Sequence, residues 1–147
     1  MKTTTFETST PEETKKIASD LASTLKGGEV IKAIGELGAG KTAFCQGLGK
    51  ALGVKGIINS PTFNLIKVYK GSKFTLYHVD CYRLEKADEE RKDLGLDEVL
   101  GDKNIITYIE WPMFGSDYLL AYHPVITLKF DVLDEERRRI TIEDERF

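Results

Sequence analysis

The stretch that most constrains the fold is the octapeptide GELGAGKT at residues 35–42. It has the pattern G-x-x-x-x-G-K-[ST], in which a glycine-rich loop between a strand and a helix cradles phosphate groups. The flanking segments have the required character. EVIKAIG before the loop is short and rich in β-branched residues, and KTAFCQGLGKALGV spaces its apolar residues as a helix does. The sequence therefore predicts a strand, a phosphate-binding loop and a helix in that order.

Each residue type in this loop has a chemical role. The glycines allow backbone conformations that are closed to residues with a Cβ, and they let the chain approach an anion closely. The amides from Leu37 to Thr42 are expected to point inward at the start of a helix, whose dipole favours negative charge. Lys41 would place a compact positive charge on the β- and γ-phosphates, and Thr42 would offer a hydroxyl to Mg²⁺.

Two carboxylates close apolar strands further along the chain. Asp80 ends FTLYHVD, and Glu110 ends NIITYIE. Either one alone is commonly a solvated strand end, but the carboxyl ends of strands in such sheets face the ligand crevice, and phosphoryl transfer needs a carboxylate near the metal. Spacing leaves open which of the two binds Mg²⁺ directly. For His78, beside Asp80, we favour an orienting or structural hydrogen bond over general-base chemistry.

The rest of the chain predicts an α/β fold. A helix is expected to be capped by Ser9 or Thr10, to bury Ile17, Leu21 and Leu25, and to stop at the two glycines 27–28. The other expected elements are strands 65–70 and 73–79 in a hairpin, a helical segment over 85–100 that is interrupted at Gly95, a buried strand 104–111, and a second hairpin from 124–133 and 137–145. We expect one P-loop NTPase-type domain over residues 1–147, with a mixed parallel and antiparallel sheet flanked by helices.

Composition indicates a cytoplasmic protein with no membrane association. No apolar run approaches the roughly 18 residues of a membrane span, and the threonine-rich start lacks the layout of a signal peptide. The net charge of −3 hides an asymmetry: residues 1–73 carry 11 Lys/Arg against 6 Asp/Glu, and residues 74–147 carry 10 against 18. One explanation of this charge difference is that the acidic residues lie on solvated helices. The alternative is that the basic half of the chain faces RNA or an acidic protein partner.

Four motifs in order carry a family resemblance. GELGAGKT, SPTF at 60–63, HVDCYRL at 78–84 and IEWP at 109–112 resemble the bacterial TsaE family, also called YjeE, over nearly the whole chain. The resemblance implies a small P-loop ATPase that works with the TsaB and TsaD proteins to install the threonylcarbamoyl group on the adenosine beside the anticodon of tRNAs. It implies that ATP hydrolysis, weak without the partners, resets their complex rather than catalysing the transfer. The tRNA would be met indirectly, through the complex.

The resemblance also assigns site residues. The implied nucleotide contacts are Glu36, Leu37, Gly38, Ala39, Gly40, Lys41, Thr42 and Arg137. Thr42 and Glu110 match Mg²⁺ ligands, and Asp80 matches a carboxylate implicated in ATPase function. Thr62 lies in a segment similar to the switch I region of GTPases, so the implied catalytic set is Lys41, Asp80, Glu110 and Thr62. Three consecutive arginines at 137–139 leave the register of the Arg137 match open.

Three other classes remain as alternatives. A small-molecule kinase would need an acceptor pocket and usually a lid that carries several arginines. Arg83 and Arg91 alone are too few for such a lid. A GTPase would carry an N-K-x-D motif, and the sequence has none, so adenine is favoured. An ATP-sensing regulator with little turnover is close to what the family resemblance implies for the isolated protein.

Overall fold

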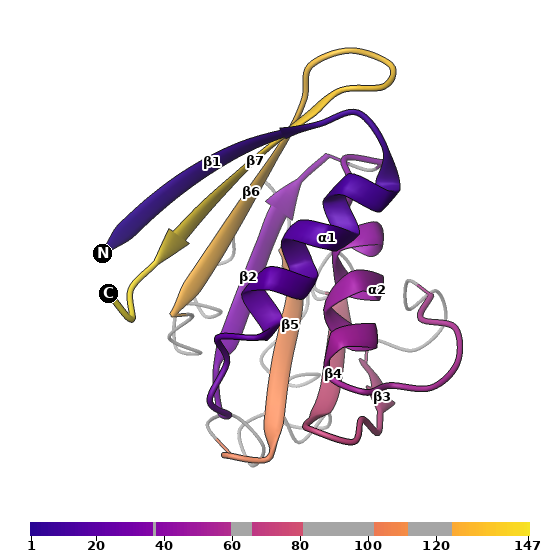
Figure 1. Cartoon of the computed structure of the whole chain (residues 1–147), viewed down its shortest axis with the longest axis vertical. Helices are drawn as coiled ribbons and strands as arrows, with labels where there is room; N and C mark the ends of the chain where they lie inside the picture. Colours follow the sequence, from indigo (N-terminus) through magenta and orange to yellow (C-terminus); the bar gives the residue numbers. More distant parts are fainter. Residues whose placement is uncertain (37, 60–65, 81–101, 112–124) are drawn as a thin grey trace, which may run out of the picture.

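The structure is a computed structural model that describes residues 1–36, 38–59, 66–80, 102–111 and 125–147, with only the backbone described for Asp80 and Trp111. Seven strands and two helices form within these ranges (Figure 1). They are β1 (Lys2–Thr8), α1 (Pro11–Ala22), β2 (Val30–Gly35), α2 (Lys41–Ala51), β3 (Ile66–Tyr69), β4 (Thr75–Asp80), β5 (Ile105–Trp111), β6 (Ile126–Val132) and β7 (Arg138–Asp144). Neither of the two helices described is long and apolar enough to cross a bilayer.

The strands form one mixed sheet in the order β1-β7-β6-β2-β5-β4-β3. The central strands β6, β2, β5 and β4 are mutually parallel, whereas β1–β7–β6 and β3–β4 pair antiparallel at the two edges. The predicted mixed sheet with antiparallel edges is confirmed, and so are both predicted hairpins. The predicted helix over 85–100 and the residue Leu65 lie outside the described residues.

Helices α1 and α2 lie side by side on one face of the sheet (Figure 1). The core forms between them and the central strands, where Phe44, Leu48 and Tyr108 are fully buried. Each buried side chain of this size contributes about 1.5–3 kcal/mol relative to an exposed one. Because β2 leads into α2 through the glycine loop, this packing also fixes the position of the loop.

Helix α1 begins as the sequence predicts but ends earlier. The Thr10 hydroxyl accepts a hydrogen bond from the Glu13 amide at 3.2 Å, and the Glu13 carboxylate accepts one from the Ser9 amide at 2.6 Å. The expected end at the glycines 27–28 is wrong, since the helix stops at Ala22. The Ser23 hydroxyl donates to the Asp20 carbonyl at 2.6 Å, a local bond of the kind that competes with helix continuation.

The buried face of α1 also differs in part from the expected stripe. Leu21 is buried as expected, whereas Ile17 is only half-buried, and Thr14 and Ala18 are buried instead. Small residues on this face allow α1 to pack closely on α2. The apolar spacing predicted burial of Ile17 because its side chain is large, whereas the smaller residues Thr14 and Ala18 occupy the buried face.

Strand β1 is an element that the sequence reasoning missed. It pairs with β7 along its whole length, from Lys2 opposite Asp144 to Thr8 opposite Arg138. Most of its residues are exposed, because an edge strand needs few apolar residues to stay in the sheet. The threonine run at residues 3–5 was the available signal, since β-branched residues favour strands.

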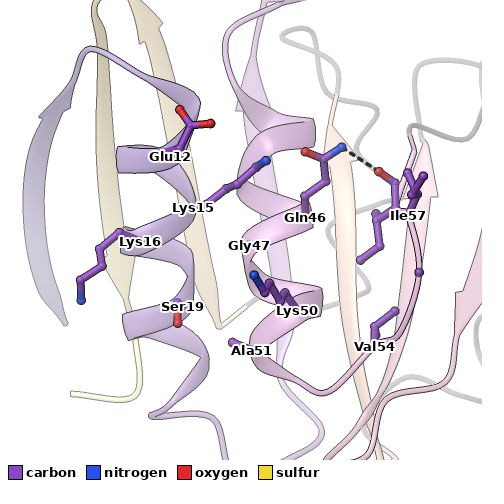
Figure 2. A pocket seen from close by; sticks show the side chains of 12 residues that line it. Glu12, Lys15, Lys16, Ser19, Gln46, Gly47, Lys50, Ala51, Val54 and Ile57 are labelled. Atoms are coloured by element: carbon purple, nitrogen blue, oxygen red, sulfur yellow. Dashed lines mark hydrogen bonds between the residues drawn. The ribbon is translucent and has the colours of Figure 1, made fainter.

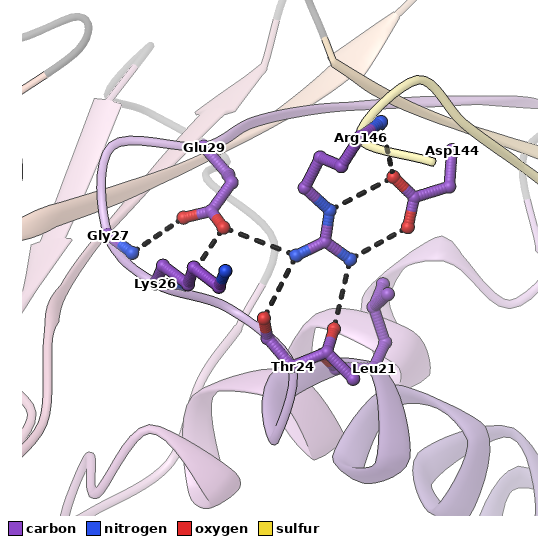
Figure 3. A network of polar contacts seen from close by, with 7 residues as sticks. All are labelled: Leu21, Thr24, Lys26, Gly27, Glu29, Asp144 and Arg146. Atoms are coloured by element: carbon purple, nitrogen blue, oxygen red, sulfur yellow. Dashed lines mark hydrogen bonds and ion pairs between the residues drawn. The ribbon is translucent and has the colours of Figure 1, made fainter. Parts of the chain in front are cut away.

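An ion-pair network ties the chain together at the start of β2 (Figure 3). The Arg146 guanidinium donates to Asp144 Oδ2 at 2.7 Å and to Glu29 Oε2 at 3.2 Å. It also donates to the Thr24 carbonyl at 3.0 Å. The Glu29 carboxylate further accepts the amides of residues 26 and 27, at 2.8 and 2.7 Å. Every buried charge here therefore has several partners.

Candidate functional site

The glycine loop joins the end of β2 to the start of α2. Gly38 and Gly40 have φ values of 79° and 107°, a left-handed backbone that a residue with a Cβ adopts at a cost. Gly35 is required for a different reason. A Cβ at Gly35 would lie 2.9 Å from both the Cβ and the carbonyl oxygen of Phe130. Two glycines thus shape the loop, and the third lets β2 pack against β6.

The start of α2 presents backbone amides without a side-chain cap. Gly40 is its N-cap and supplies no side-chain hydrogen bond, and the first turn carries no acidic residue. The first amides of a helix have no partner within the helix, and the dipole makes this end positive. Such an N-terminus is suited to hold an anion, as the sequence predicts.

Lys41 lies inside the loop and not on its surface. Its side chain is buried, and its ammonium donates to the Gly35 carbonyl at 2.8 Å. The backbone carbonyl of Lys41 accepts a hydrogen bond from the Tyr108 hydroxyl at 2.8 Å. Strand β5 is therefore bonded directly to the first residue of α2. Glu36 is exposed, Ala39 is buried and Thr42 is half-buried, while Leu37 lies outside the described residues.

The backbone positions of the two predicted site residues, Asp80 and Glu110, are brought opposite each other. Strands β4 and β5 are parallel neighbours, and Asp80 lies directly opposite Glu110 in their register. On its other side β5 pairs with β2, so that Glu110 lies opposite Ala33, two residues before the loop begins at Gly35. Asp80 and Glu110, which follow Gly35 by 45 and 75 positions, thus lie in register at the same end of adjacent strands, beside the loop.

The Glu110 side chain is buried and points toward α2. Its exposed fraction is 5%, and it lies two residues from Tyr108 on the same face of β5. Burial, and then the nearby charge of Glu110, raise the pKa of the Cys45 thiol on α2 well above its usual value. Burial is likewise the largest cause that raises the pKa of Tyr108, followed by Cys45 and Glu110. Both groups therefore stay protonated at neutral pH.

Glu110 has an incomplete set of partners. Its Oε1 lies 3.2 Å from Nε2 of the fully buried His78, but the two atoms are not aligned as donor and acceptor. Glu110 Oε1 and both ring nitrogens of His78 consequently lack a hydrogen bond within the described part of the chain. A buried polar atom of this kind costs free energy. A hard cation such as Mg²⁺ is the type of partner that a carboxylate oxygen accepts, so the donor set fits that ion.

The β6–β7 hairpin reaches the loop through an arginine next to the predicted one. Arg137 is exposed and forms an ion pair with Asp134 at 2.6 Å, which lowers the pKa of Asp134 to about 2. Arg138 instead donates to the Gly38 carbonyl at 3.4 Å. The nucleotide contact assigned to Arg137 stays a prediction, and the sequence could not distinguish among the three arginines because their spacing shows no register.

A cavity of about 410 Å³ opens beside the loop. The beginning of α1, the loop and the hairpin line it, and the loop contributes Gly38 and Gly40 while the hairpin contributes Arg138. The sequence reasoning did not assign Tyr108, Arg138 or the start of α1 to the site. Tyr108 could have been found, because it precedes Glu110 by two residues in a strand. Thr62 lies outside the described residues, and only the backbone of Asp80 is placed.

A parallel central sheet, a glycine loop that opens a helix, and carboxylates at the ends of adjacent strands define a P-loop NTPase-type domain. Comparison with known proteins gives the family. The family model described as "Threonylcarbamoyl adenosine biosynthesis protein TsaE" matches residues 8–140. The chain belongs to the TsaE family, whose role is the biosynthesis of threonylcarbamoyladenosine in tRNA.

Individual relatives agree with this family. The tRNA threonylcarbamoyladenosine biosynthesis protein TsaE of Bacillus subtilis is 39% identical over 147 residues, which are 100% of this chain and 90% of the relative. The protein of the same name from Rickettsia felis is 45% identical over 132 residues, or 89% of this chain and 74% of the relative. The crystal structure of Bacillus subtilis YdiB superposes with a TM-score of 0.75 at 32% identity, over 97% of this chain and 86% of that one.

Proposed function

We propose that this protein binds and hydrolyses ATP as an accessory protein of tRNA N6-threonylcarbamoyladenosine modification. The observation that carries the proposal is the placement of a buried, incompletely partnered carboxylate, Glu110, beside the phosphate loop. A loop alone implies an anion, whereas phosphoryl transfer also needs a carboxylate near the phosphates. The family supplies the biological setting in which this chemistry would be used.

In this proposal the triphosphate lies in the loop, held by the amides at the start of α2 and by Lys41. The Lys41 ammonium already lies inside the loop, 2.8 Å from the Gly35 carbonyl, where its positive charge would lie against the phosphates. The cavity between the start of α1 and the hairpin would receive the nucleoside end. Its volume of about 410 Å³ is within the range of small-molecule sites.

Thr42 and Glu110 would hold Mg²⁺, which supplies positive charge against the developing charge on the phosphates. Thr42 is in the first turn of α2, on the element that Glu110 faces. Asp80, directly opposite Glu110 in the sheet, is assigned either to the ion as a second ligand or to the attacking water as an orienting carboxylate. Tyr108 keeps β5 and the loop in fixed relation through its bond to the Lys41 carbonyl.

The partners in this proposal are TsaB and TsaD, and ATP hydrolysis resets their complex after modification. This part rests on the family resemblance of the four ordered motifs, and its setting is the role named by the family and by the relatives in Bacillus subtilis and Rickettsia felis. The tRNA would be contacted through the complex. The protein itself would be a weak ATPase in isolation.

Hydrolysis of ATP measured under three conditions tests the proposal. The protein is assayed alone, with a panel of small hydroxyl and nucleoside acceptors, and with TsaB, TsaD and tRNA. We expect slow turnover alone and clear stimulation by the complete set of partners. Transfer of phosphate to a small acceptor would instead identify a kinase. ATP binding without hydrolysis under every condition would identify a nucleotide-sensing regulator.

A further inference from the structure

A groove of about 910 Å³ lies along the two helices, outside the site described above. It is bounded by α1, α2 and the segment 54–58 that follows α2 (Figure 2). Lysines come from both helices: Lys15 and Lys16 from α1, and Lys50 from α2. The far wall is aliphatic and includes Val54 and Ile57. Glu12 of α1 also lines the groove, so three lysines, one carboxylate and an aliphatic wall share one surface.

The walls of this groove are held in place by close contacts. A Cβ at Gly47 would lie 2.6 Å from the Cα and the carbonyl oxygen of Lys15, so the two helix backbones touch. On the other side, Gln46 Nε2 donates to the Ile58 carbonyl at 2.8 Å (Figure 2). A surface fixed in this way loses little entropy when a ligand binds.

The three lysines in the groove differ in their ion pairs within the described part of the chain. Lys16 forms an ion pair with Asp20 at 2.9 Å. For Lys15 and Lys50, the described part of the chain provides no carboxylate within ion-pair distance. Ile57 is 81% exposed, so most of its aliphatic surface is open to a partner. Lys15 and Lys50, neither of them ion-paired within the described residues, therefore share the groove with an aliphatic residue that is open to solvent (Figure 2).

We propose that this groove docks an acidic segment of a protein partner, in which carboxylates flank an aliphatic side chain. The carboxylates would pair with Lys15 and Lys50, and the aliphatic group would pack on Ile57 and Val54. RNA fits less well, because affinity for a nucleic acid requires many phosphate contacts. Single-stranded bases also stack on aromatic side chains, and the described residues that line the groove include none.

The proposed docking is independent of ATP. The groove lies along the middle and end of α2, whereas the phosphate loop is at its start, and none of the described groove residues belongs to the nucleotide site. Binding can therefore be measured without nucleotide, so that failure of this inference and failure of the ATPase proposal are separate results.

Titration of the ¹⁵N-labelled, nucleotide-free protein with a synthetic peptide tests the inference. The probe is a capped 12-residue peptide with the core Asp-Glu-Leu-Glu-Asp between Gly-Ser spacers. A second peptide replaces the acids with lysine, a third replaces the leucine with serine, and a 12-nucleotide oligouridylate serves as the RNA arm. At 16.5 kDa the protein is suited to amide shift mapping.

We expect saturable shifts at Gln46, Lys50 and Ile57 with the acidic peptide alone. The double variant Lys15→Glu/Lys50→Glu should weaken binding about tenfold or more, and Ile57→Ser about fivefold. The matched controls Lys73→Glu and Val68→Ser change exposed residues outside the groove and should leave affinity unchanged. Binding that is insensitive to the groove variants, preferential binding of the oligouridylate, or no binding of the acidic peptide would each overturn the inference.

Discussion

Buried carboxylates lie near both ends of β2, and they differ in their hydrogen bonds. At its start, Glu29 accepts three hydrogen bonds, from two backbone amides and from Arg146 (Figure 3). Beside its far end, Glu110 Oε1 has no hydrogen bond from the described residues, although its exposed fraction is similarly small. The first carboxylate is satisfied by the fold alone, and the second is left with capacity for a ligand.

This difference in hydrogen bonding assigns Glu29 to the stability of the fold and Glu110 to the chemistry of the site. Leaving a buried polar atom unpaired costs about 1–3 kcal/mol, and a fold retains such a cost where the group has another use. The Glu29 and Arg146 network contributes to stability, and its buried carboxylates already have partners within the protein. We therefore expect substitutions at the two ends to affect different measurements.

The largest effect is expected from Glu110→Gln. Removing the charge without changing the shape should lower the Mg²⁺-dependent turnover of ATP about a hundred- to a thousandfold, while the free energy of unfolding stays the same or rises slightly. Magnesium titrations of the ATPase rate and urea unfolding measure the two quantities. Glu145→Gln, an exposed residue at the C-terminal end, is the control. An unchanged magnesium titration would move the ligand role to Asp80.

Lys41→Ala tests the loop itself. Loss of a charge-assisted hydrogen bond to phosphate, worth about 1.5–3 kcal/mol, should weaken ATP binding by about ten- to a hundredfold. Isothermal titration calorimetry measures it. Lys50→Ala removes the same type of side chain from an exposed position on the same helix and should leave ATP affinity intact. Normal ATP binding and turnover in Lys41→Ala would refute the proposed loop chemistry.

Arg146→Ala should have the converse effect at the other end of β2. The variant leaves Glu29 and Asp144 buried without their shared guanidinium, and Arg146 itself is only 18% exposed. We expect a loss of about 2–3 kcal/mol in the free energy of unfolding, with ATP affinity unchanged. Arg139→Ala, which removes a surface ion pair to Glu7, should cost less than about 1 kcal/mol. Equal effects of the two variants would contradict the assigned role of the network.

The smallest expected effect concerns acid stability. The hydrogen bond from Arg146 is the main cause that lowers the pKa of Asp144. A carboxylate with a depressed folded-state pKa stabilises the protein above its unfolded value of about 3.9, and this stabilisation is lost as the pH falls through the folded-state pKa. The free energy of unfolding should thus fall less steeply below about pH 4 in Arg146→Ala than in the parent protein. Urea unfolding at several pH values below about 5 measures this dependence. If the free energy of unfolding falls equally steeply with pH in both proteins, the Asp144–Arg146 pair does not contribute to acid stability.

The parts of the site that the sequence predicted are those encoded by short patterns. The loop and the strand ending at Glu110 are each contiguous, and hydrophobic periodicity located them. The opposition of Asp80 and Glu110 depended on strand order, which local patterns do not specify. The sequence did not identify Arg138 as the arginine that contacts the loop, because its two neighbours are also arginines. Only the twist of the hairpin determines which of the three reaches Gly38. Strand β1 was not predicted because its pairing with β7, and not the burial of apolar side chains, holds it in the sheet.

The hydrogen bond from the Tyr108 hydroxyl to the Lys41 carbonyl has a mechanical consequence. It joins the strand that carries Glu110 to the helix turn that carries Lys41 and Thr42. Thermal displacement of either element is transmitted to the other, so the spacing between the carboxylate and the loop varies less than the position of either one. The two halves of the site therefore move as one rigid unit, and the Tyr108 side chain sets the distance between β5 and the start of α2.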